Sequence, residues 1–75
     1  MIIGFLTIGK DSRSCILSAL NGKDQSVIMP GQYLYVNVSN GWIPVELKYS
    51  DRIGRYYFSH LPELPVNGRM AMVKS

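Results

Sequence analysis

The chain has 75 residues, a formal net charge of +3 at pH 7, 47% hydrophobic residues and 17% charged residues. A chain of this length forms one small domain, residues 1–75, and its hydrophobic content excludes a disordered chain. No apolar run approaches the roughly 20 residues that a membrane-spanning helix needs. The N-terminal segment lacks the basic region and cleavage site of a secretion signal, so we expect a cytoplasmic protein.

Turn dipeptides divide the chain into short segments that are rich in β-branched and aromatic residues. Asn-Gly occurs at positions 21–22, 40–41 and 67–68, and each copy can form a tight turn. Between the turn signals, the sequence predicts strands over residues 2–8, 14–20, 33–39, 43–49, 55–59 and 69–73. Short strands at this spacing predict an all-β fold, a partly open barrel of about five or six antiparallel strands.

The segment from Gly31 to Phe58 predicts a three-stranded antiparallel meander. Pairing Val36 with Val45 places every aliphatic side chain of the first two strands on one face, which we expect to be the core face. Pro44 has no N–H to donate. We therefore expect a four-residue loop over residues 39–42, which keeps Pro44 out of a hydrogen-bonded position opposite its partner strand.

A second four-residue loop, residues 51–54, is expected to close the meander. It predicts three facing pairs, which are Tyr49 with Tyr56, Leu47 with Phe58, and Lys48 with Tyr57. The following segment holds two prolines, so it cannot be a central strand. We expect it to cross an open end of the barrel, with Leu61 and Leu64 plugging that end.

The residue types that carry catalysis are sparse in this chain. His60 is the only histidine and lies beside a proline-bounded loop, where a solvated side chain is the commoner role. Cys15 is the only cysteine, and its place in a predicted strand favours a small buried hydrophobe. The acidic residues lack metal-ligand spacing, and no phosphate-binding glycine pattern occurs. We expect no enzymatic activity, no cofactor, no metal and no small-molecule substrate.

An aromatic and basic patch on the outer face of the meander and its loops is the candidate binding site. Its residues are Tyr33, Tyr35, Trp42, Lys48, Arg52, Arg55 and Tyr57. Such a patch can seat a protein partner or a second copy of the chain, or it can stack nucleic-acid bases while the basic groups meet phosphates. The first or last strand could equally cover it, or its tyrosines could lie flat on the sheet. Because the charge is small and the basic residues lie at opposite ends of the meander, we expect a protein partner.

A set of turn and hydrophobic residues in the C-terminal two-thirds of the chain carries a family resemblance. The set is Pro30-Gly31, Leu34, Val36, Trp42, Ile43, Val45, Glu46, Tyr56-Tyr57, Gly68 and the strand Met70 to Val73. At these positions the chain resembles a family of small uncharacterised bacterial domains with SH3-like β-barrel character, found among mobile-element and phage-associated genes. The resemblance implies an SH3-like barrel in a bacterial protein. It implies no activity, because the family has none assigned.

Overall fold

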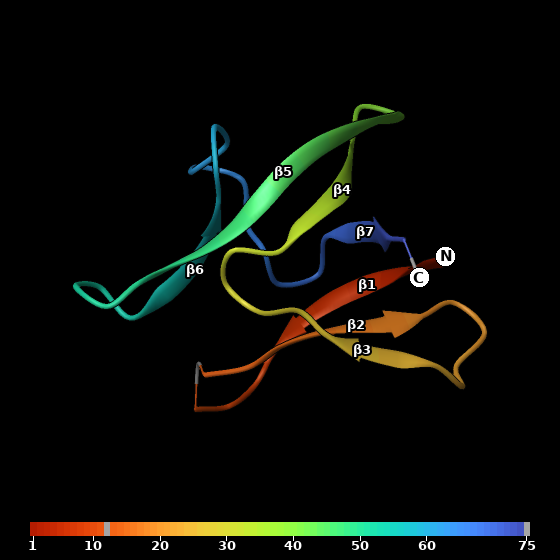
Figure 1. Ribbon diagram of the computed structural model, residues 1–75, viewed down its shortest axis with the longest axis horizontal. Coiled ribbons are helices and arrows are strands. Elements are labelled where there is room, and N and C mark those ends of the chain that lie inside the picture. The colour runs from red at the N-terminus through yellow and green to blue at the C-terminus, as the bar shows by residue number, and fades with distance from the viewer. Residues whose placement is uncertain (12, 75) are drawn as a thin grey trace.

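The structure is a computed structural model that describes residues 1–11 and 13–74. In these residues, seven antiparallel strands form one sheet (Figure 1). The strands are β1 (Ile2–Ile8), β2 (Cys15–Ala19), β3 (Gln25–Val27), β4 (Tyr33–Val38), β5 (Gly41–Ser50), β6 (Arg55–Phe58) and β7 (Met70–Val73). The prediction of an all-β fold is confirmed. Within those residues, no helix is long and apolar enough to span a membrane.

The order of strands across the sheet is β3-β2-β1-β7-β4-β5-β6, so the last strand joins two halves of the molecule. Figure 1 shows β7 between β1 and β4, and Ile2 at the start of β1 pairs with Val73 at the end of β7. The sheet does not close into a barrel, and β3 and β6 are its two edges.

The expected number of about five or six strands is too low because β3 was missed. Two of its three residues, Gln25 and Ser26, carry no strand signal.

Side chains from one side of the sheet, joined by loop residues, form a single core. Its buried members are Leu6, Cys15, Leu17, Ile28, Leu34, Val36, Val45, Leu47, Tyr56, Phe58, Val66, Ala71 and Val73. The prediction that Cys15 is a buried hydrophobe is confirmed. Leu61 and Leu64, from the proline-containing segment, are partly buried and pack against this core. Because side chains alternate along each strand, those between the core-facing positions point to the opposite, outer side of the sheet.

The register of the first hairpin differs from the prediction by two residues. Val36 lies opposite Ile43, and the turn consists of Ser39 and Asn40, which both have positive φ angles, 50° and 66°. The predicted four-residue loop is therefore wrong. Two positive φ angles are the signature of a type I′ turn, whose twist suits a hairpin. Since a shift of two residues preserves the facing of every side chain, Val36 and Val45 are both buried, as predicted.

Pro44 explains why the turn lies at Ser39 and Asn40. In a two-residue hairpin, the pair next to the turn is hydrogen-bonded and the pairs then alternate. A turn at Asn40 and Gly41 would put Pro44 in a hydrogen-bonded pair. The observed register places Pro44 opposite Tyr35, in a non-hydrogen-bonded pair, where its missing N–H costs β4 nothing.

The second hairpin has the predicted register. Its pairs are Leu47 with Phe58, Lys48 with Tyr57, and Tyr49 with Tyr56. The rings of Tyr49 and Tyr56 meet edge to face with centroids 4.8 Å apart. The chain turns back at the end of β6, where Phe58 forms a bridge with Leu61.

We expect Val36→Asp to unfold the domain, because it would bury an unpaired carboxylate in a core with no buried polar side chain among the described residues. Asn37→Asp, on the outer side of the same strand, should change the free energy of unfolding by no more than about 0.5 kcal/mol. Thermal melts of the two variants measure the difference. Equal losses would contradict the assignment of the two faces.

Gly4 in β1 occupies a position that tolerates no side chain. A methyl group there would overlap the carbonyl oxygen of Ser18 on the neighbouring strand. We expect Gly4→Ala to cost about 1–3 kcal/mol of unfolding free energy, measured by urea denaturation. Gly41→Ala is the control, because its nearest atom, the Val38 carbonyl oxygen, would be 3.5 Å away. If both variants lost the same stability, the close approach at Gly4 would be refuted.

Candidate binding face

The outer side of the meander continues onto β7 and β1, which lie beside it in the sheet and do not cover it. Tyr35 on β4 lies opposite Pro44 on β5 and, across its other edge, opposite Met72 on β7. Met72 in turn lies opposite Ile3 on β1. Four side chains on four neighbouring strands therefore form one uninterrupted apolar row.

A second row lies one step along the strands. Phe5 on β1 is opposite Met70 on β7, and Asn37 on β4 is opposite Trp42 on β5. The exposed fraction is 73% for Tyr33, 44% for Phe5 and 39% for Trp42. Four other side chains on this side are half-buried, which are Ile3, Tyr35, Met70 and Met72. We call the following set the apolar face: Ile3, Phe5, Tyr33, Tyr35, Trp42, Pro44, Met70 and Met72.

Two depressions flank Tyr33 on this side of the sheet. The larger, of about 660 Å³, is lined by residues of β4, β5 and β6 and the adjoining turn, including Lys48, Tyr57 and His60. The smaller, of about 360 Å³, is lined by Tyr33, Leu34, Tyr35, Pro44 and Lys74. Tyr33 and Pro44 line both depressions, so the apolar face is uneven, and side chains of a partner could fill its depressions.

One of the lysines beside the apolar face, Lys48, lies next to a carboxylate. Lys48 Nζ lies 3.9 Å from the Glu46 carboxylate, and both side chains are partly exposed, at 44% and 26%. An ion pair of this kind contributes little stability. Glu46 also lies directly opposite Tyr33. The lysine that the sequence suggested as a phosphate contact is therefore accompanied by a carboxylate.

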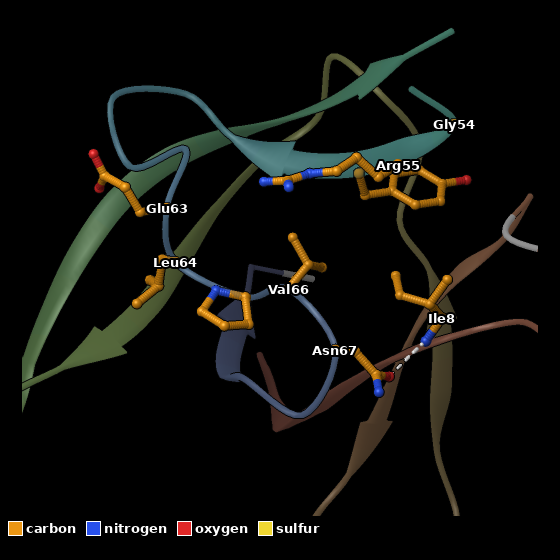
Figure 2. A pocket seen from close by; sticks show the side chains of 9 residues that line it. Ile8, Gly54, Arg55, Glu63, Leu64, Val66 and Asn67 are labelled. Carbon is orange, nitrogen blue, oxygen red and sulfur yellow. Dashed lines mark hydrogen bonds between the residues drawn. The ribbon is translucent and has the colours of Figure 1, made fainter. Parts of the chain in front are cut away.

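The structure brings together five of the seven predicted site residues and separates the two arginines from them. Tyr33, Tyr35, Trp42, Lys48 and Tyr57 lie on the outer side of β4, β5 and β6. Arg55 instead donates a hydrogen bond of 2.9 Å to the Pro62 carbonyl oxygen. Figure 2 shows its side chain extending along a different pocket, of about 300 Å³, which Ile8, Leu64 and Val66 also line. Arg52 lies in the exposed loop at residues 51–54.

A further pocket, of about 440 Å³, lies between β2 and the hairpin of β5 and β6. Its lining includes Cys15, Ile28, Tyr49 and Tyr56. Burial raises the pKa of the Cys15 thiol from 9.0 to about 11, so this thiol stays protonated and unreactive at neutral pH. His60 is exposed on the turn after β6. No cluster of three metal-ligating side chains occurs in residues 1–11 and 13–74.

Sequence reasoning missed the contribution of β1 and β7 to the apolar face. A signal for it exists, because Met70 to Val73 and most of Ile2 to Ile8 are apolar at every position. Strands that are apolar on both sides are typical of sheets covered on both faces, whereas a solvated face produces alternation.

No protein-family model, curated protein or solved structure matches this chain significantly.

The Cys15 pKa predicts a pH dependence of stability. Because the folded pKa, about 11, exceeds the unfolded value of 9.0, the stabilising effect of burying the neutral thiol is complete below pH 9 and is lost as the pH rises toward 11. Urea denaturation across this range should show a steeper loss for the native chain than for Cys15→Ala. Parallel curves would show that the thiol is not shielded from water.

Proposed function

We propose that the protein is a non-enzymatic binding module that recognises a protein partner through its apolar face. The observation that carries this proposal is the row of Ile3, Met72, Tyr35 and Pro44, which crosses four strands without a charged side chain. Contiguous exposed apolar patches on soluble proteins often mark interaction sites. Aromatic residues and methionine are also the residue types enriched in the buried centre of protein interfaces.

Nucleic-acid binding is the alternative, favoured by the larger depression. Tyr33, Tyr57 and His60 supply planar rings there, and Lys48 supplies a positive charge. Base stacking on such rings needs a basic groove to hold the backbone. Glu46 weakens that groove, since it lies 3.9 Å from Lys48. We therefore place protein recognition first.

We also infer that the domain is an SH3-like, partly open barrel, related to the small bacterial domains that the sequence resembles. Support comes from β5, a ten-residue strand that pairs with β4 along one part and with β6 along another. A strand shared in this way turns the sheet around the core (Figure 1).

Site-specific photo-crosslinking in the native host tests the proposed function. A photoreactive phenylalanine analogue in place of Tyr35 should give a discrete protein adduct, because Tyr35 lies in the middle of the apolar row. The same analogue at Ile53 is the matched control, since Ile53 is 63% exposed but lies in the β5–β6 loop. Equal adduct patterns at the two positions would contradict recognition through the apolar face.

Titration of single-stranded DNA at several salt concentrations tests the alternative. If the apolar face binds protein, affinity should remain weak and nonspecific, and Tyr57→Ala and Lys48→Ala should not change it. If bases stack on the face, Tyr57→Ala should cost about 1–3 kcal/mol, and Lys48→Ala should reduce the salt dependence by about one phosphate contact. Submicromolar binding at physiological salt that is lost in Tyr57→Ala would overturn the preference for a protein partner.

A further inference from the structure

We propose that the pocket of about 440 Å³ between the two edge strands of the sheet binds a small, uncharged and mainly apolar molecule that carries a hydrogen-bond acceptor, such as a carbonyl oxygen. This site is separate from the apolar face and does not depend on the proposed function. Its volume lies within the range of roughly 300–1,000 Å³ that is typical of small-molecule pockets. The walls of the pocket, a hydroxyl group in it and its charges each point to a ligand of this kind.

The pocket exists because the sheet stays open. A closed barrel has no edges, since its first and last strands pair. Here the edge strands remain apart, and the pocket is lined by Val27 of β3 and by Tyr56 of β6. Much of the remaining lining is apolar and comes from Cys15, Ile28, Met29 and Pro30. Val27 and Met29 are 59% and 61% exposed, so the apolar lining reaches the protein surface.

Tyr56 supplies a hydroxyl group without a partner. The residue is only 9% exposed, yet its hydroxyl makes no hydrogen bond to any other residue in the ranges 1–11 and 13–74. Among those residues, the only fully buried side-chain nitrogen or oxygen without a partner is Arg69 Nε. The Tyr56 hydroxyl therefore reaches open space. Polar groups in a buried side chain are normally paired, and an acceptor on a ligand would pair this one.

The groups near the Tyr56 hydroxyl indicate which pocket it faces, because Tyr56 also lines the pocket of about 300 Å³. Burial is the main cause that raises the pKa of this hydroxyl, and the nearby Cys15, Tyr49 and Asp11 raise it further. Cys15 and Tyr49 line the pocket of about 440 Å³ and not the other one. The ring of Tyr49 also contacts the ring of Tyr56. The hydroxyl therefore lies at the larger of the two pockets.

The charges of the site favour an uncharged ligand. The pKa of the Cys15 thiol is about 11 and that of the Tyr56 hydroxyl is raised above its ordinary value, so both groups keep their protons at neutral pH. They can donate hydrogen bonds but supply no charge. The charged side chains in the lining, Arg13 and Asp51, are exposed and have opposite signs. An ion would lose hydration against the apolar walls without a buried countercharge to replace it.

NMR titration of the purified chain with three small probes tests the inference. Benzamide has an uncharged carbonyl acceptor, toluene has the same ring without an acceptor, and benzoate has a negative charge. We expect benzamide to shift the amide resonances of Cys15 and Ile28 and to leave those of Met70 and Met72, on the apolar face, in place. Benzoate should bind more weakly than benzamide, by about tenfold or more, because of its hydration.

Tyr56→Phe isolates the hydroxyl group, because it keeps the ring. It should weaken benzamide binding by about two- to tenfold, the effect of one net hydrogen bond, and leave the affinity for toluene unchanged. Retained toluene binding shows that the variant is folded and that its pocket is intact. Tyr57→Phe makes the same chemical change at the next residue, on the outer side of β6, and should alter the binding of neither probe.

Three results would overturn the inference. The first is benzamide binding that leaves the Cys15 and Ile28 resonances unchanged, or no binding at all. The second is tighter binding of benzoate than of benzamide, which would show a site for anions. The third is a folded Tyr56→Phe chain that binds benzamide as the native chain does, or a loss of benzamide binding in Tyr57→Phe instead. If Tyr56→Phe does not fold, the resonance shifts and the benzoate comparison in the native chain decide.

Discussion

The pairing of β7 with both β1 and β4 is the constraint on which the rest of the structure depends. Without it, β3-β2-β1 and β4-β5-β6 would be two three-stranded units with no strand pairing between them, and each would hold only part of an already small core. On its inner side, β7 contributes Ala71 and Val73 to the core. On its outer side, Met72 lies between Ile3 and Tyr35 and completes the apolar row. One four-residue strand therefore joins the core and creates the candidate binding face.

How much the sequence could predict depends on the sequence distance over which each pairing acts. The hairpin of β5 and β6 has the predicted register because its loop, residues 51–54, is defined by nearby turn residues. The hairpin of β4 and β5 is shifted by two residues from the predicted register, because the turn does not lie where the Asn-Gly signal pointed. The observed register places Pro44 in a non-hydrogen-bonded pair without the four-residue loop that the sequence predicted. Facing survived the shift because side chains alternate with a period of two. β3 could not be predicted, because its pairing with β2 and not its composition makes Gln25 to Val27 a strand.

The candidate site also has one part that the sequence could predict and another that it could not. Tyr33, Tyr35 and Tyr57 could be placed on one face from local alternation alone. Ile3 and Met72 could not be added to them, since their positions follow from contacts between the two ends of the chain. Alternation along β6 also does not predict that Arg55 is separated from the tyrosines, because this depends on the hydrogen bond from its guanidinium to the Pro62 carbonyl oxygen. The observed face lacks the two arginines and includes Ile3 and Met72, so it is more hydrophobic than the aromatic and basic patch that the sequence predicts.

This change of chemistry connects binding with stability. A domain of this size has a thin stability margin, and its core depends on pairing between distant strands that costs loop-closure entropy. A partner that covers the outer side of β1 and β7 binds only the folded state, because the rows of the apolar face exist only when those strands are paired. Binding to the folded state alone raises apparent stability with partner concentration. The same strand pairing that makes the apolar face would therefore be reinforced by whatever occupies it.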